Sequence, residues 1–384
     1  MVRYRFGLLL LLWAGIGCRP ESDPAGTKQT SAASCDESFD PSRNYFPDHV
    51  NIRHATGFSV RYANAYKVVT IQKPWRDAGK TFTYVLKACG APDPDMQADA
   101  VITVPVKRIA TTSTTQLPGF IQLERTSAWV AHAGLSYVTL PELRAVIEKG
   151  GVRELGSGEV NQEALLAVRP DLVMTYVLGG NQAQWTKLQE LGLKTVLNAE
   201  YVEDDPLARA EWLKFMALFL NEEAKAEHVF EAIESAYETL KASLRNVPDQ
   251  PSVFSGSAFE GQWYIAGKSN YLAHFLEDAG GRYAFSGTDQ TLMPSFERVL
   301  LEGAPADVWI GTVAYPNRAA VEQSDTRLLN FKSIQNGRYF WYDGHFFEGA
   351  VAEPHIVLQD LAAILHPSVY PNHRLKYFQR METR

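Results

Sequence analysis

The stretch "EALLAVRPDLVMTYV" at residues 163–177 begins with the periodicity of a helix and ends with the apolar run of a buried strand. A similar stretch, "ERVLLEGAPADVWIG", recurs at 297–311. Each begins with a glutamate, continues through an apolar helical turn, passes a proline and ends in a short apolar run. Two such units predict a chain that is built of two similar halves.

The segments around both stretches alternate between helix and strand patterns. After residue 108 the strand pattern "RIATTS" is followed by the helix pattern "LPELRAVIEKG", and after residue 248 the alternation resumes with "SVFSGSAF" and "YLAHFLEDAGG". Helices that alternate with short apolar strands favour mostly parallel sheets with α/β crossovers. We therefore expect an α/β fold with one lobe over 108–220 and a second lobe over 248–370.

A long helix is predicted between the two lobes, over residues 221–247. Asn221 is a favourable first residue because its side chain can cap backbone N–H groups, and Glu222 and Glu223 suit the positive end of the helix dipole. A single apolar face is formed by residues spaced by three and four: Ala226, Val229, Phe230, Ile233, Tyr237, Leu240 and Leu244.

The N-terminus has the pattern of an export signal. Two arginines precede an apolar run that is too short for a bilayer span of about 20 residues, and small residues follow before Cys18. We expect a signal peptide over 1–17 and lipid on Cys18, with plain secretion as the alternative. Residues 18–50 are rich in polar residues and proline and are predicted to be a tether.

A β-rich segment is expected over 51–107, because β-branched and aromatic residues alternate there between turn residues. Residues 371–384 are expected to form a C-terminal tail. If Cys18 carries lipid, Cys35 and Cys89 remain, and in an oxidising compartment they are expected to form one disulfide. Two unpaired thiols are the alternative.

Composition and charge restrict the class of protein. The chain is 46% hydrophobic and 21% charged, which is typical of a globular protein. Its net charge is −7 and no basic stripe is present, so a nucleic-acid partner is not expected. The nine histidines are scattered and "GQWYIAGKS" lacks the spacing of a phosphate-binding loop, so we expect neither a metal site nor a nucleotide cofactor.

Several motifs in the same order resemble the substrate-binding lipoproteins of ABC transporters for iron complexes and cobalamin. They are "VNQEALLAVRPDLVMTY", "WYIAGKSNYLAHFLEDAGG", "SFERVLLEGAPADVWIG" and "LAAILHP". The resemblance covers about 108–370 and implies two α/β lobes joined by one helix, with the ligand between them. It also implies that Glu163 and Glu297 dock to arginines of the membrane permease. The alternative is that each glutamate only supports the first turn of its helix.

Ligands of open α/β sheets bind beyond the carboxyl ends of the strands. Small hydroxyl groups at these ends can donate hydrogen bonds, aromatic rings can supply flat apolar walls, and an arginine can pair with an anionic group. The candidate ligand-binding residues are Thr112, Ser113, Thr114, Thr115, Tyr176, Ser257, Trp263, Tyr264, Tyr271, Arg318 and Trp341.

We therefore expect a non-catalytic, monomeric lipoprotein on the periplasmic side of the bacterial cell envelope. It would capture a metal chelate, either a ferric siderophore or a haem-like iron complex, and deliver it to a permease dimer. Cobalamin is the alternative ligand in the same family. An exported enzyme or a structural surface lipoprotein are alternatives of other classes, but no nucleophile–base pair or cluster of carboxylates can be placed in the sequence.

Overall fold

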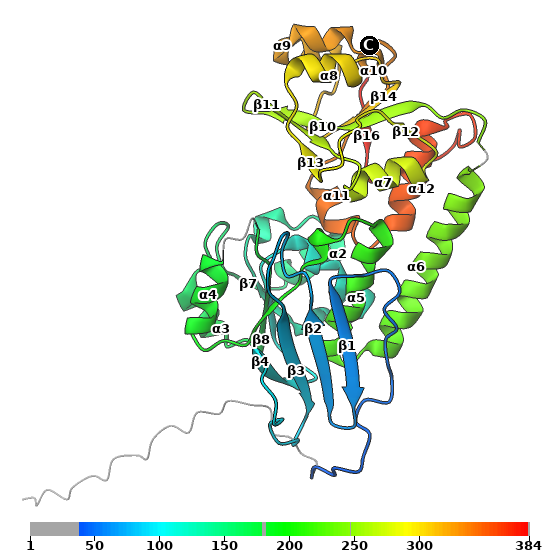
Figure 1. Ribbon diagram of the computed structural model, residues 1–384. Helices are drawn as coiled ribbons and strands as arrows, with labels where there is room; N and C mark the ends of the chain where they lie inside the picture. The colour runs from blue at the N-terminus through cyan, green and yellow to red at the C-terminus, as the bar shows by residue number, and fades with distance from the viewer. Residues whose placement is uncertain (1–37, 179–181, 246, 383–384) are drawn as a thin grey trace, which may run out of the picture. The chain divides into compact units, whose positions relative to one another are not determined.

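The computed structural model describes residues 38–178, 182–245 and 247–382 (Figure 1). The predicted signal peptide, Cys18, Cys35 and most of the tether lie outside the described residues. Cys89 is disulfide-bonded. Within the described ranges, no helix is both long enough and apolar enough to cross a membrane.

The β-rich segment forms a four-stranded sheet in the order β1-β2-β3-β4. Its strands are β1 (Phe58–Ala63), β2 (Tyr66–Ile71), β3 (Phe82–Ala88) and β4 (Ala100–Val104). Alternate residues point to one face and are buried there, including Val69 and Ile71 in β2. This face shares one apolar core with the first α/β lobe. A hydrogen bond also joins them, because the Leu197 N–H donates to the hydroxyl of Tyr84 at 3.1 Å.

The first lobe has a parallel sheet in the order β7-β6-β5-β8-β9. Its strands are β5 (Ile109–Thr111), β6 (Trp129–His132), β7 (Arg153–Glu154), β8 (Leu172–Thr175) and β9 (Thr195–Leu197). Its short helices are α1 (Pro118–Gln122), α2 (Pro141–Glu148), α3 (Gln162–Val168) and α4 (Ala183–Glu190). Every residue of β8 is buried, as a strand covered on both faces requires.

The second lobe has a larger, mixed sheet. Its strands are β10 (Ser252–Phe259), β11 (Gln262–Ala266), β12 (Arg282–Tyr283), β13 (Thr291–Leu292), β14 (Val308–Gly311), β15 (Tyr339–Trp341) and β16 (Gln379–Arg380). Strands β12, β10, β14 and β15 are parallel neighbours in that order, and β11, β13 and β16 extend the sheet in antiparallel pairings.

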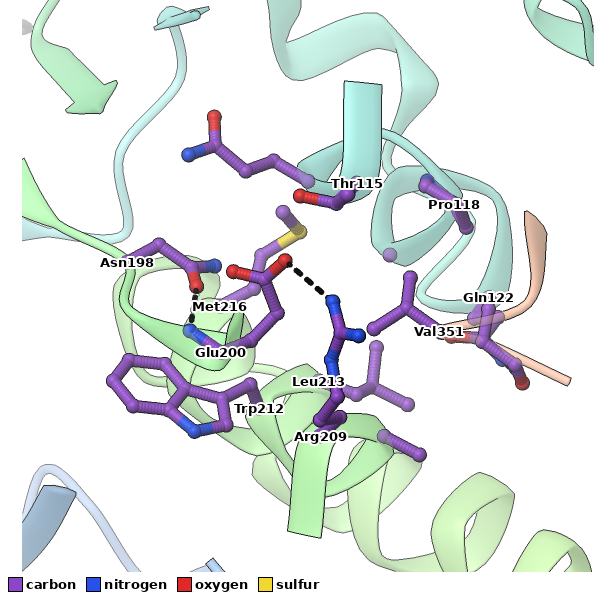
Figure 2. A pocket seen from close by; sticks show the side chains of 14 residues that line it. Thr115, Pro118, Gln122, Asn198, Glu200, Arg209, Trp212, Leu213, Met216 and Val351 are labelled. Carbon is purple, nitrogen blue, oxygen red and sulfur yellow. Dashed lines mark hydrogen bonds and ion pairs between the residues drawn. The ribbon is translucent and has the colours of Figure 1, made fainter. Parts of the chain in front are cut away.

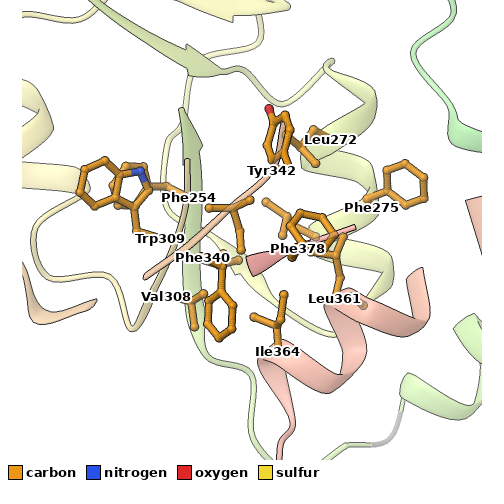
Figure 3. Close-up of a cluster of buried hydrophobic side chains, with 14 of the residues drawn as sticks. Phe254, Leu272, Phe275, Val308, Trp309, Phe340, Tyr342, Leu361, Ile364 and Phe378 are labelled. Carbon is orange, nitrogen blue, oxygen red and sulfur yellow. The ribbon is translucent and has the colours of Figure 1, made fainter. Parts of the chain in front are cut away.

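The helices of the second lobe cover this sheet around an aromatic core. They are α7 (Tyr271–Asp278), α8 (Phe296–Glu302), α9 (Arg318–Ser324), α10 (Lys332–Gln335), α11 (Gly344–Gly349) and α12 (Pro354–Leu365). Figure 3 shows part of this core, in which the rings of Phe254 and Trp309 stack with centroids 5.5 Å apart. The prediction of an α/β fold with two lobes is confirmed, with a parallel sheet in the first lobe and a parallel centre of β12, β10, β14 and β15 in the second.

The two repeated passages, each with an aspartate shortly after a proline, perform the same task in both lobes. Strand β8 pairs with β5, and β14 pairs with β10, so each passage leads into the strand beside the first strand of its lobe. The Asp171 carboxylate accepts the N–H groups of Lys107 and Arg108 at 3.0 and 2.9 Å, just before β5. The Asp307 carboxylate accepts the N–H of Ser252 at 2.8 Å, at the start of β10. Each aspartate thus fixes the position of the neighbouring strand.

Two helices, α5 (Pro206–Leu220) and α6 (Glu223–Leu244), follow the first lobe. The predicted apolar face of α6 is confirmed, since Ala226, Phe230, Ile233, Tyr237 and Leu244 are buried. The predicted capping role of Asn221 was wrong. Asn221 has φ 55° and ends α5 in a left-handed conformation, and its side chain accepts a hydrogen bond from buried Lys67 at 2.8 Å.

Buried carboxylates hold the extended chain that precedes β1 against α5. The fully buried Glu211 accepts the backbone N–H groups of Arg53, His54 and Ala55 at 2.7–3.1 Å. Glu203 does the same for Thr56 and Gly57 at 3.0 and 2.7 Å. These contacts join the N-terminal segment to the first lobe.

The end of the chain packs into the second lobe instead of forming a separate tail after residue 370. Strand β16 pairs with β15, and Tyr377, Phe378 and Met381 are buried in the core of the lobe. The buried carboxylate of Asp360 on α12 accepts the N–H groups of Lys376 and Tyr377, both at 2.8 Å.

Candidate ligand-binding site

A hollow of ≈ 230 Å³ lies at the carboxyl ends of the strands of the first lobe. Three of its lining residues, Thr112–Thr114, follow β5, and Tyr176 follows β8. The remaining lining residues are Ala133, Tyr137, Ser157, Gly158 and Gln184. Side chains from four strand ends and from α4 therefore converge on one hollow.

Hydroxyl groups and one amide fix the loop after β5. The Thr112 hydroxyl bonds to that of Thr175 at 2.8 Å, across the ends of β5 and β8. The hydroxyls of Ser113 and Thr115 bond to each other at 2.9 Å. The Thr112 N–H donates to the side-chain oxygen of Gln116, which is buried below the loop. These bonds hold the small polar side chains in place before any ligand arrives.

The hollow is electrically neutral. Among the described residues that line it, none carries a formal charge. His132, at the end of β6, is fully buried, and its Nδ1 lies 2.8 Å from the Thr111 hydroxyl. Burial lowers the pKa of His132 to about 4, so the imidazole is uncharged at neutral pH. The hollow offers hydroxyl, amide and aromatic groups to a ligand, and no charge.

Sequence reasoning missed Tyr137, Ser157, Gly158 and Gln184. Tyr137 is 60% exposed and lies in the loop after β6, so the carboxyl-end rule could have found it. Ser157 and Gly158 follow β7, which has only two residues and therefore gives no readable strand pattern.

A second, smaller cavity of ≈ 30 Å³ lies where the two lobes meet (Figure 2). Thr115, Gln116, Glu200 and Arg209 line it from the first part of the chain, and Val351 and Ala352 line it from the second lobe. Figure 2 shows Arg209 and Glu200 as an ion pair, with 3.5 Å between nitrogen and oxygen. Thr115 therefore lies at the contact between the lobes and does not line the larger hollow.

Further contacts join the lobes beside this cavity. The Arg209 guanidinium lies 4.0 Å from the centroid of the Tyr271 ring, a cation–π contact. The fully buried Glu348 of α11 accepts the N–H groups of Thr139 and Leu140 at 2.6 and 3.0 Å, immediately before α2. Its other carboxylate oxygen is buried and has no hydrogen-bond partner among the residues that the structure describes.

Two of the predicted ligand-binding residues are core residues. Trp263 is 5% exposed and stacks on Phe296 and Phe331, and Trp341 is 7% exposed in β15 beside Tyr339. Both indole rings pack in the core, and ligand contact by these two residues stays a prediction. Aromatic residues in a strand pattern could face either the core or a ligand, and the pattern alone does not separate the two.

The other candidates of the second lobe do not converge on a cavity. Ser257 is buried, and its hydroxyl accepts the N–H of Thr312 at 2.8 Å, which holds the ends of β10 and β14 together. Tyr264 is 37% exposed on β11, and Arg318 is exposed at the start of α9. Tyr271 lines a small cavity at the contact between the lobes.

Glu163 and Glu297 occupy the same position on two seven-residue helices, α3 and α8, and both are exposed. Each is the second helical residue after a capping side chain, Asn161 in α3 and Ser295 in α8. Hydrogen bonds from its own backbone and from Ser295 hold the pKa of Glu297 below its usual range. In the parts of the chain that the structure describes, no group of three or more His, Cys, Asp or Glu side chains could hold a metal ion.

A family model and several known proteins match this chain. The family model described as periplasmic binding protein matches residues 109–343, which is more than half of the chain. An uncharacterized lipoprotein of Methanocaldococcus jannaschii is 25% identical over 343 residues, with 84% of this chain and 87% of the relative covered. A second uncharacterized lipoprotein of that organism is 25% identical over 291 residues, which cover 72% of this chain and 69% of the relative.

Solved structures share the fold at low sequence identity. A periplasmic heme-binding protein from Pseudomonas aeruginosa aligns with a TM-score of 0.58 at 16% identity, over 73% of this chain and 99% of that chain. A possible iron-binding protein from Staphylococcus epidermidis aligns with a TM-score of 0.57 at 16% identity, over 68% and 99%. Since the family model covers more than half of the chain, from the first strand of the first lobe through α6 and into the second lobe, the chain belongs to the periplasmic binding protein family, whose members are transport receptors and not enzymes.

Proposed function

We propose that this protein is the lipid-anchored substrate-binding component of an ABC importer and captures a metal chelate for delivery to the permease. The chelate is a ferric siderophore or a haem-like iron complex, and cobalamin is the alternative. The single observation that carries the proposal is the neutral, hydroxyl-lined hollow at the strand ends of the first lobe.

The chemistry of the hollow suits a bulky, preassembled complex. Thr112, Ser113 and Ser157 offer hydroxyl groups, and Tyr137 and Tyr176 offer flat rings. A bare metal ion would need several charged or imidazole ligands, and none lines the hollow in the described chain. A chelate already satisfies the coordination of its metal, so its periphery needs only hydrogen bonds and apolar contact.

The names of structures with the same fold agree with this class of ligand. They include the heme-binding protein of Pseudomonas aeruginosa, a ferric hydroxamate transport protein of Saccharomonospora viridis and a vitamin B12-binding protein of Vibrio cholerae. The relatives from Methanocaldococcus jannaschii that are called lipoproteins support lipid on Cys18.

Capture would involve little movement of the lobes. Helix α6 has 22 residues, about 33 Å at 1.5 Å per residue, and packs against both α5 and α12. Such a helix is a stiffer hinge than a pair of loops. Saturating ligand should therefore change the radius of gyration in X-ray scattering by about 1 Å or less, and a contraction of several ångström would contradict this mode of closure.

Delivery would use Glu163 and Glu297 as one anionic contact on each lobe. Both carboxylates are exposed, and they stand at matching positions. A permease dimer with two-fold symmetry can meet both with the same basic residue, and complementary charge sets the register and speeds the encounter.

The test is a titration of the purified protein with ferric siderophores, haem and cobalamin, followed by tryptophan fluorescence. Free iron, zinc and manganese are controls. We expect one chelate to quench the tryptophan fluorescence saturably, at or below about micromolar concentration. Tyr176→Phe and Thr114→Val should weaken that binding, whereas Tyr370→Phe, outside the hollow, should leave it unchanged. Binding of free metal alone, or no binding at all, would contradict the proposal.

A further inference from the structure

The helices that carry Glu163 and Glu297 also expose leucines. Within the described chain, four leucines are among the large apolar residues with substantial exposure, and three of them lie on the seven-residue helices α3 and α8. These are Leu166 at 44%, Leu300 at 39% and Leu301 at 76%. The remaining one, Leu178, follows β8.

The two helices match residue by residue. The glutamate is the second helical residue in each, a buried Leu165 or Val299 follows two positions later, and an exposed leucine follows at the next position. The capping side chains of Asn161 and Ser295 fix this register, because each accepts the backbone N–H three residues ahead. The same side chains are therefore presented at the same place on both helices.

Each exposed leucine is a surface neighbour of its glutamate. Residues three apart on a helix lie on the same face, about 5–6 Å apart between Cβ atoms. Leu166 thus lies beside Glu163, and Leu300 lies beside Glu297. A leucine left in water in one place needs no explanation, but an acid–leucine pair repeated at equivalent positions of both lobes does.

We propose that Leu166 and Leu300 are docking residues, each of which enters an apolar pocket on the importer's membrane subunit. The inference rests on the proposed function and deepens it. The partner surface is then defined by its chemistry: at two positions related by two-fold symmetry, a basic residue stands beside an apolar pocket. The glutamates steer and orient the approach of the two proteins. The leucines, which become buried against the permease, slow the dissociation of the complex.

The experiment measures binding of the full-length lipoprotein to the cognate permease–ATPase complex in nanodiscs by surface plasmon resonance. Leu166→Ser and Leu300→Ser should each weaken binding about 10-fold, mainly through faster dissociation, and the double variant about 100-fold. The salt dependence of the association rate should stay that of the wild type. Glu163→Gln and Glu297→Gln should reduce that salt dependence instead.

Two controls define the site. Leu301 is the most exposed of the leucines, but α3 has Ala167 at the equivalent position, so Leu301→Ser should change the affinity less than about 2-fold. Val369→Ser, at an exposed residue after α12, should have no effect. All variants should bind the chelate like the wild type, which shows that they are folded.

The outcomes separate the two claims. If the wild type binds the importer and the leucine variants bind equally well, the inference is overturned and the proposed function stands. If Leu301→Ser weakens binding as much as Leu300→Ser, the paired-leucine arrangement is wrong. If the wild type binds neither chelate nor importer, both claims fail.

Discussion

Replacement of Glu211 by glutamine should cost the protein more stability than any surface change in the same segment. The Glu211 carboxylate is fully buried and accepts the N–H groups of Arg53, His54 and Ala55. It also accepts the Lys214 ammonium at 2.9 Å, and Lys214 is fully buried too. Glutamine keeps the shape but turns one acceptor oxygen into a donor.

The size of the effect follows from these contacts. The new amide donors of Glu211→Gln would face backbone donors, so about two N–H groups lose their acceptor, at about 1–1.5 kcal/mol each. The buried Lys214 would keep only Glu227, at 3.1 Å, as its charged partner. We expect a loss of about 3–4 kcal/mol in the free energy of unfolding, from these hydrogen bonds and the weakened ion pair.

The assay is urea denaturation followed by circular dichroism, with hydrogen exchange of the amides of residues 53–55. Glu234→Gln is the matched control, because Glu234 pairs with Arg53 at 2.8 Å but is partly exposed, and its loss should cost less than about 1 kcal/mol. Adding Lys214→Met to Glu211→Gln should recover part of the loss. Equal effects of Glu211→Gln and Glu234→Gln, or full additivity with Lys214→Met, would contradict the stabilising role of the Glu211 carboxylate.

Two further outcomes are expected from the charged contacts of the lobes. Partial burial acts to raise the pKa of Asp307, but hydrogen bonds from Lys332 and Ser252 outweigh it and lower the pKa from 3.8 to about 2. The stability that Asp307 contributes should be full above about pH 4 and be lost as the pH falls towards 2, and acid titrations of Asp307→Asn should show a weaker dependence in that window. Glu348→Ala should speed hydrogen exchange of the Thr139 and Leu140 amides, and unchanged exchange would show that this contact between the lobes is not populated in solution.

Most of what could be predicted of the fold came from the two repeated helix–Pro–strand passages. Both helix–Pro–strand passages have a clear change of period, from the 3.6 residues of a helix to a continuous apolar run, and each leads into a buried strand, β8 or β14. The face of α6 was equally readable because buried and exposed residues alternate around it. The apolar periodicity of a long helix such as α6 can be recognised from the sequence without knowing which surface the helix packs against.

Other elements left no such signal. Every residue of α5 except Arg209 is buried, so the helix has no polar face to reveal its period. Asn221 suits both the start of a helix and a left-handed helix end, and its contact with Lys67, which is distant in sequence, leaves no local signal. Strand β7 is too short to be recognised from sequence.

The sequence indicated part of the lining of the hollow where the residues follow strands with a readable apolar run. The loop after β5 and Tyr176 after β8 line the hollow as the carboxyl-end rule requires. The aromatic residues of the second lobe were not predictable, because Trp263 and Trp341 have the same residue type and strand context as a ligand-facing ring would have. Which face of the sheet they occupy depends on strand order, and the sequence does not state it.

The binding of a chelate in the hollow of the first lobe is tested by the position of the metal in a crystal grown with the chelate that saturates the fluorescence titration. Diffraction at the absorption edge of the metal locates it without reference to the surrounding chain. One anomalous peak is expected beside the loop of Thr112–Thr114, between Tyr137 and Tyr176. A peak elsewhere on the protein, or a bound ligand that leaves this hollow empty, would contradict this expectation.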